Sequence, residues 1–157
     1  MVVSKQNGFT LIELMVVVVI VAVLLAAGVI SLGGRDNQQQ RQIWTQTQSM
    51  LQMACDQAAF NQRVYLVSVS EQGLEAYYRQ QGEWQPAKIN KVSWTAEQPK
   101  AWTVNEQLTE LWQLPEMGWL CWPSGLVSEG EIRMSNSGSA TEQVLRWDEG
   151  LNFVFEN

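Results

Sequence analysis

The sequence contains no histidine, so it lacks both a common general base and the commonest metal ligand of proteins. It has only two cysteines, Cys55 and Cys121, and they do not have the paired spacing of a zinc site. No glycine-rich loop has the spacing that binds phosphate, and no spacing of serine and lysine marks a nucleophile. We therefore expect no enzymatic activity, no cofactor and no metal site.

Basic residues are also few, because ten lysines and arginines face sixteen acids and leave a net charge of −6. Proteins that bind nucleic acid neutralise its phosphates with clustered Lys and Arg, and no such cluster is present. We therefore expect no nucleic-acid partner. The acidic pairs Glu129/Glu131 and Asp148/Glu149 lack the loop spacing of an EF-hand, so we interpret them as solvated turn acids.

Charge is missing altogether from Leu14 to Gly34, a run long enough to span a bilayer as a helix. Glu13 lies directly before this run, inside the apolar segment. A carboxylate costs on the order of 2.5–3.5 kcal/mol at the bilayer centre and less near its edge. An acid in this place needs a partner, which makes Glu13 a candidate functional residue.

An ordinary signal peptide is the alternative for residues 1–30. Lys5 precedes the apolar run, and Ala26-Ala27-Gly28 suits a signal peptidase. Against it, the uncharged run is longer than the usual apolar core of about 7–15 residues, and its acid lies inside the apolar segment. Under this alternative the chain would be a periplasmic binding protein in which the head alone acts.

The segment Gly8–Leu14 reads Gly-Phe-Thr-Leu-Ile-Glu-Leu. It resembles the processing motif of type IV pilins and of the pseudopilins of type II secretion systems. The resemblance implies that a prepilin peptidase cuts between Gly8 and Phe9 on the cytoplasmic side and methylates the new amino terminus of Phe9. Residues 1–8 would then be a leader peptide, and the apolar run would stay in the mature protein.

Cleavage would free an α-amine on Phe9, about one helical turn or about 6 Å along the axis from Glu13. Glu13 could contact its own terminus, and a first-turn acid also complements the helix dipole. In a helical fibre the subunits are axially offset, so Glu13 could instead neutralise the Phe9 ammonium of the next chain. We expect this role in subunit assembly; the plainer alternative is an acid that reaches the lipid headgroups.

No proline lies between Phe9 and Phe60, so the sequence predicts one helix of about fifty residues. Its first part, residues 9–34, is expected to be a transmembrane and assembly helix, and residues 35–62 an amphipathic stalk. Glycines at 28, 33 and 34 weaken the prediction of continuity. Apolar and small residues recur with helical spacing on one face of the stalk: Ile43, Thr47, Met50, Leu51, Ala54 and Ala58.

Residues 63–157 contain short alternating or β-branched runs separated by turns, which predicts antiparallel strands and an α+β fold. The long helix would pack against this β-rich head. Strands are expected at residues 63–70, 74–79, 92–95, 101–104, 119–122, 131–135, 143–147 and 151–155, with a short helix or irregular crossing at 105–114.

Within the pseudopilins the head is most similar to the minor type called type II secretion system protein H. The similarity rests on Val64–Val69, Gly82–Pro86, Pro123–Gly125 and Ile132–Met134. It implies a second sheet, and other minor and major pseudopilins as partners in a tip complex that starts the fibre exporting folded proteins. It also implies a single-pass inner-membrane anchor and a periplasmic C-terminal domain in a Gram-negative bacterium. A minor pilin of a type IV pilus, serving adhesion, motility or DNA uptake, is the alternative.

Two further features leave alternatives open. Cys55 falls in the predicted helix and Cys121 in a late strand, so a disulfide in an oxidising compartment and a pair of buried thiols are both compatible with the sequence. The chain also has eight tryptophans, most of which we expect in the core. Trp44, on the stalk, is the candidate for contact with a partner subunit.

Overall fold

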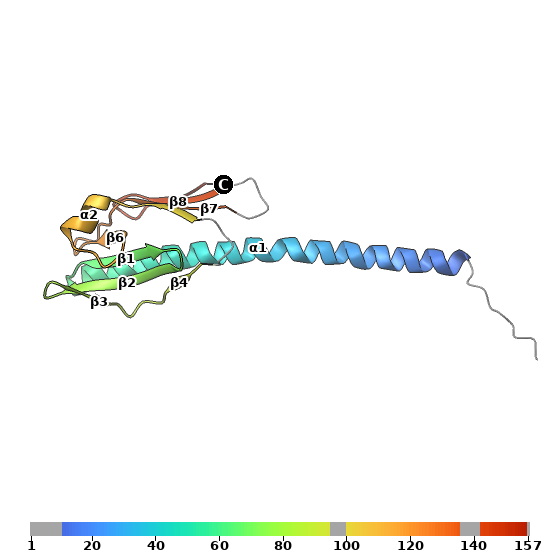
Figure 1. Cartoon of the computed structure of the whole chain (residues 1–157), viewed down its shortest axis with the longest axis horizontal. Coiled ribbons are helices and arrows are strands. Elements are labelled where there is room, and N and C mark those ends of the chain that lie inside the picture. The colour runs from blue at the N-terminus through green and yellow to red at the C-terminus, as the bar shows by residue number, and fades with distance from the viewer. Residues whose placement is uncertain (1–10, 95–99, 136–141, 157) are drawn as a thin grey trace, which may run out of the picture. The chain divides into compact units, whose positions relative to one another are not determined.

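A long N-terminal helix, a short second helix and two antiparallel sheets make up the described part of the chain (Figure 1). The computed structural model describes residues 11–94, 100–135 and 142–156, and in residues 26–37 it describes the backbone only. The chain divides into two compact units, residues 1–41 and residues 42–157. The elements are α1 (Leu11–Asn61), β1 (Tyr65–Ser70), β2 (Gly73–Gln80), β3 (Glu83–Pro86), β4 (Val92–Ser93), β5 (Lys100–Thr103), α2 (Glu106–Leu111), β6 (Gly118–Cys121), β7 (Gly130–Ser135), β8 (Glu142–Trp147) and β9 (Phe153–Glu156).

Helix α1 is 51 residues long, which confirms the prediction of one long helix. It contains no proline, and it continues through Gly28, Gly33 and Gly34 because isolated glycines weaken a helix without breaking it. Among the described residues, no helix offers a stretch long and apolar enough to cross a membrane. Because residues 9–34 lie partly outside the described side chains, their expected membrane-spanning role stays a prediction.

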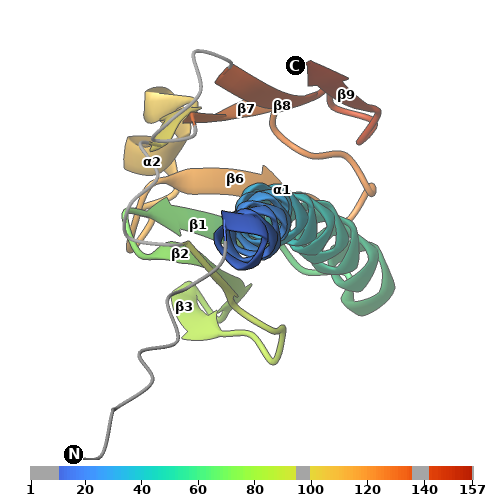
Figure 2. The same cartoon turned by 90° about the vertical axis from the view of Figure 1, so that its right-hand side faces the viewer.

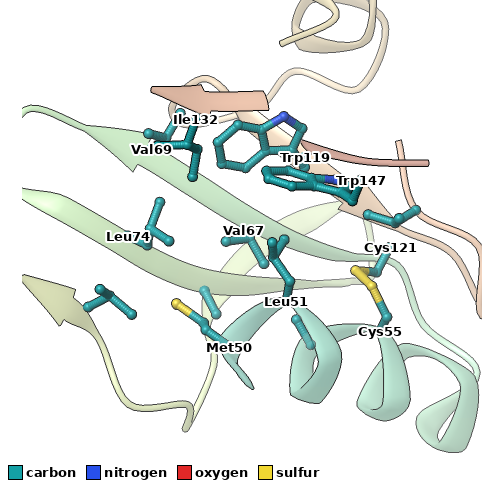
Figure 3. Packing of buried hydrophobic residues seen from close by; sticks show 14 of the residues in the cluster. Met50, Leu51, Cys55, Val67, Val69, Leu74, Trp119, Cys121, Ile132 and Trp147 are labelled. Atoms are coloured by element: carbon teal, nitrogen blue, oxygen red, sulfur yellow. A yellow bond between two sulfur atoms is a disulfide. The ribbon is translucent and has the colours of Figure 1, made fainter. Parts of the chain in front are cut away.

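The amphipathic face predicted for the stalk is confirmed. All of its predicted members are at most 4% exposed, and all but the buried polar Thr47 belong to the hydrophobic core of the head. Met50 and Leu51 lie on this face of α1 and point toward the first sheet, where Val67 and Leu74 lie (Figure 3). Burial of this stripe against a sheet explains why the sequence alternates apolar residues with glutamines at helical spacing.

The first sheet has the strand order β3-β2-β1-β6, with β4 paired to β2, and every pairing is antiparallel. Val67 in β1 lies opposite Ala76 of β2 and Trp119 of β6. The second sheet has the order β5-β7-β8-β9 and is also antiparallel. Figure 2 shows β7, β8 and β9 in one layer, and β6, β1, β2 and β3 in another. The prediction of an α+β fold with antiparallel sheets is confirmed.

Several element ends differ from the prediction by a few residues, and local backbone geometry explains the largest differences. The first strand begins at Tyr65 because Gln62 has a positive φ of 51° and ends α1. The last strand begins at Phe153 because Leu151 has a φ of 58° and Asp148 accepts backbone hydrogen bonds that form a turn. Thr95, expected in a strand, lies outside the described residues.

The segment for which a short helix and an irregular crossing were both open forms helix α2. The side chain of Asn105 accepts a hydrogen bond from the backbone N–H of Gln107 at 3.1 Å and caps the helix. At the other end, the backbone N–H of Trp112 donates to the carbonyl of Leu108. These local bonds satisfy backbone groups that a helix of this length would otherwise leave to solvent.

Candidate functional site

The processing motif is described in part. Gly8 and Phe9, the expected cleavage and methylation residues, lie outside the described residues. Glu13 lies in the first turn of α1, on an exposed position, where an acid interacts favourably with the helix dipole. The role of Glu13 in subunit assembly stays a prediction.

The helix around Glu13 is apolar on every side. Every residue from Leu11 to Leu25 is exposed within the chain, and the large apolar side chains among them are 48–80% exposed. Soluble monomers rarely expose a continuous apolar surface of this extent. Surfaces of this kind are usually covered by lipid or by another protein.

Cys55 of α1 and Cys121 of β6 form a disulfide, with their Cα atoms 4.9 Å apart (Figure 3). This separation lies within the range of ordinary disulfides. Both residues are buried, and they fasten the C-terminal part of α1 to an edge strand of the first sheet. The disulfide therefore holds α1 covalently against the first sheet of the head.

Trp44, expected to contact a partner subunit, is buried in the head of its own chain. Its Nε1 donates a hydrogen bond to Oε1 of Gln143 at 2.8 Å, and its ring meets Phe155 edge to face with centroids 5.7 Å apart. The structure corrects the expectation, because a side chain enclosed in this way is not available as an exposed anchor. Trp44 instead joins α1 to the second sheet.

A tryptophan–arginine cluster on the first sheet was not singled out by the sequence. The guanidinium carbon of Arg79 lies 5.8 Å from the ring centroid of Trp84 and 5.1 Å from that of Trp112. Nε1 of Trp84 donates to the carbonyl oxygen of Trp112 at 3.1 Å. The cluster fastens the end of α2 to β2 and β3. No spacing in the sequence connects Trp112 with the other two residues, so no local signal could have found it.

The acids interpreted as solvated turn residues differ from one another. Asp148 is exposed and fits that interpretation: hydrogen bonds from Asn152, then from Gly150, lower the pKa of its carboxyl. Glu131 does not fit it, because its side chain is only 13% exposed and accepts hydrogen bonds from Arg146 and Arg133. These bonds, that from Arg146 above all, lower the pKa of Glu131 against the opposing effect of burial. In the described part of the chain, no group of three or more Cys, Asp or Glu residues could hold a metal ion.

Comparison with known proteins finds similarities for the N-terminal segment and for the fold that follows it. A family model described as the prokaryotic N-terminal methylation motif matches residues 3–29. A solved structure of the minor pseudopilin EpsH from the type 2 secretion system of Vibrio cholerae is similar, with a TM-score of 0.58 and 10% identity. It is matched over 74% of this chain and 94% of EpsH.

A second structure of Vibrio cholerae EpsH has a TM-score of 0.54 and 11% identity, over 69% of this chain and 87% of that one. At this identity the likeness shows the fold. A comparison with curated proteins finds no match. Both similar structures are of a minor pseudopilin. The chain therefore combines a match to the prokaryotic N-terminal methylation motif with a domain that has the fold of a minor pseudopilin.

Proposed function

We propose that the chain is a minor pseudopilin of a type II secretion system. It takes part in the tip complex that starts assembly of the pseudopilus, the fibre that exports folded proteins across the outer membrane. One combination of observations carries this proposal: the methylation motif matches residues 3–29, and the domain that follows has the fold of EpsH. Its partners are other minor and major pseudopilins and the prepilin peptidase.

In this proposal the leader of residues 1–8 is removed, and residues 9–34 stay in the inner membrane as a single-pass anchor. The exposed apolar surface of Leu11–Leu25 supports this role, because lipid covers it before assembly and neighbouring helices cover it in the fibre. Residues 35–62 form the stalk, and residues 63–157 form a periplasmic head. The Cys55–Cys121 disulfide supports export, because disulfides persist in oxidising compartments such as the periplasm.

Glu13 is proposed to pair with the methylated amine of Phe9 in a neighbouring subunit. The amine exists only after the cut at Gly8, so an uncleaved chain lacks the cation that the carboxylate needs. In a low-dielectric surrounding, an unpaired carboxylate is costly and a paired one sets the register of adjacent helices. A chain whose leader has been cleaved could therefore assemble into the fibre, whereas an uncleaved chain could not.

Mass spectrometry of the mature chain from a host with a prepilin peptidase tests the assignment. We expect an amino terminus at N-methylated Phe9. A mature chain that starts after Ala27 or Gly28 would show a signal peptide and would overturn the proposal. Gly8→Leu should leave a full-length precursor, whereas Gly28→Leu, the matched control within the helix, should be processed normally.

Co-purification tests the fibre and the role of Glu13. In a host with both systems, the tagged chain should capture type II pseudopilins; capture of type IV pilus subunits instead would favour a minor pilin. Glu13→Val should be processed and methylated as usual but capture fewer partners, and Glu13→Asp is the control that keeps the charge. Equal capture by the parent and Glu13→Val would show that the carboxylate does not pair between subunits.

A further inference from the structure

The edges of the two sheets differ in how they are protected. Edge strands leave backbone N–H and C=O groups unpaired, and proteins usually protect them with proline, lysine, a short length or a covering segment. Strand β3 contains Pro86, and β4 has only two residues. Strand β5 begins with Lys100, and β6 is covered where Cys121 bridges to Val127. Strand β9 has four residues, as many as β3, β5 and β6, but it contains neither proline nor lysine, and no described segment covers its outer edge.

Strand β9 pairs with β8 on one side, with Val154 opposite Arg146 and Phe155 opposite Leu145. The described chain places no strand on its other side. In an antiparallel strand, alternate residues direct their N–H and C=O groups away from the paired neighbour, so β9 offers free groups along its outer edge. Val154 is 53% exposed and Phe155 43% exposed, so this edge is also apolar.

The surface beside β9 is negatively charged. A hollow of about 420 Å³ lies there, and Glu129, Asp148, Glu156 and Arg146 are among its lining residues. Arg146 already pairs with Glu131 and, at 3.2 Å, with Glu156. Glu129 and Asp148 have no cationic partner in the described part of the chain. An apolar edge beside uncompensated acids is complementary to an extended segment that carries positive charge.

We propose that β9 accepts an extended segment of a partner protein as an added strand, and that this segment carries Lys or Arg next to Glu129 and Asp148. The free backbone groups of β9 provide the hydrogen bonds, and Val154 and Phe155 provide apolar contact. Glu129 and Asp148 favour a partner segment that carries Lys or Arg. This interaction goes beyond the proposed function and does not depend on which fibre the chain joins.

Fluorescence anisotropy with the full chain in neutral detergent micelles tests the proposal. The probe is a labelled peptide of about six residues, the length of an ordinary strand, that alternates valine with lysine. We expect saturable binding, and binding at least about tenfold weaker for a matched peptide that alternates valine with glutamate, since about 1.4 kcal/mol separates the two. A valine–lysine peptide with a central proline should also bind weakly, because proline lacks a backbone donor.

Three variants, each first checked for a melting temperature like that of the parent, test whether the peptide binds at β9. Val154→Lys should weaken binding of the valine–lysine peptide at least about tenfold, because it adds like charge to the edge. Thr103→Lys on β5, at the opposite edge of the sheet, is the matched control and should bind like the parent. Glu129→Gln should reduce the preference for lysine over glutamate.

Absence of saturable binding, equal binding of the lysine and glutamate peptides, or an equal loss in Thr103→Lys would each overturn the proposal. A dimer of the parent chain that Val154→Lys dissolves would show that the occupant is a second copy, and would overturn the assignment to a basic partner segment.

Discussion

The indole rings of Trp119 and Trp147 meet edge to face, with centroids 4.8 Å apart and planes at 77°. This contact joins β6 of the first sheet to β8 of the second, and Figure 3 shows the two rings at the centre of the core. Each Nε1 donates to a backbone carbonyl, that of Thr103 for Trp119 and that of Ser128 for Trp147. Pairs of this kind contribute about 0.5–1.5 kcal/mol beyond their buried area.

Gly130 makes room for both rings. A Cβ atom at this position would lie 2.2 Å from Nε1 of Trp119 and 2.3 Å from Cζ2 of Trp147. We expect Gly130→Ala to destabilise the protein by at least about 1–3 kcal/mol, since two ring systems would have to move. Thermal unfolding measures the loss, with Gly150→Ala as control because its nearest atom is 3.3 Å away. Equal melting temperatures for the two variants would contradict the expected clash.

Trp44 is expected to contribute to stability and not directly to partner capture. Trp44→Ala removes a buried ring and its hydrogen bond to Gln143, and should cost about 3–5 kcal/mol in the free energy of unfolding. Chemical denaturation measures this cost. Trp44→Phe keeps most of the apolar volume and should lose less. If Trp44→Ala were as stable as the parent but failed to capture partners, Trp44 would contact a partner subunit after all.

The Cys55–Cys121 disulfide should stabilise the folded head. It closes a sequence separation of 66 residues, for which the chain-entropy model gives about 4 kcal/mol. We expect a strong reductant to lower the urea midpoint of the parent. The double variant Cys55→Ser/Cys121→Ser should have a low midpoint with and without reductant. A parent midpoint that does not change after complete reduction, checked by thiol labelling, would count against this contribution.

Glu131 should make stability depend on pH. Hydrogen bonds from Arg146, and then Arg133, lower its folded-state pKa, so the unfolded state binds its proton first as the pH falls. The stabilisation is therefore present above the ordinary Glu pKa of about 4.3 and is lost as the pH drops through the folded-state value. Glu131→Gln should melt below the parent at neutral pH, and the difference should shrink in acid.

The control for Glu131→Gln is Glu129→Gln, whose carboxylate makes no ion pair in the described part of the chain. At neutral pH its melting temperature should stay close to that of the parent. A melting-temperature difference for Glu131→Gln that stays constant from neutral pH to strong acid would refute the pH dependence.

The sequence predicted the long helix and its buried face well because both depend on local properties. The absence of proline permits one continuous helix, and the spacing of Ile43, Leu51 and Ala58 places them on one side of it. The presence of strands was also predictable from alternation and turn residues. The residues at which strands begin and end were less predictable, because Gln62 and Leu151 have positive φ values that such residues seldom adopt.

The environment of single side chains was not predictable in the same way. Trp44 was expected to meet a partner because it lies on the stalk, but its ring packs against Phe155 from the end of the chain. Glu131 was interpreted as a solvated acid, but Arg146 from the neighbouring strand pairs with it. In both cases the deciding neighbour is distant in sequence, so no local pattern records the contact.

The sequence by itself determined that a carboxylate at Glu13 begins an uncharged apolar run, and that a helix without proline continues from it into an amphipathic stalk. These properties follow from residue type and spacing along one segment. Tertiary structure alone decided that Cys55 and Cys121 are bonded, that Gly130 lies against two indole rings, and that β9 is an edge strand of the second sheet. Each of these depends on which strands become neighbours, and that choice is made by packing between residues far apart in the chain.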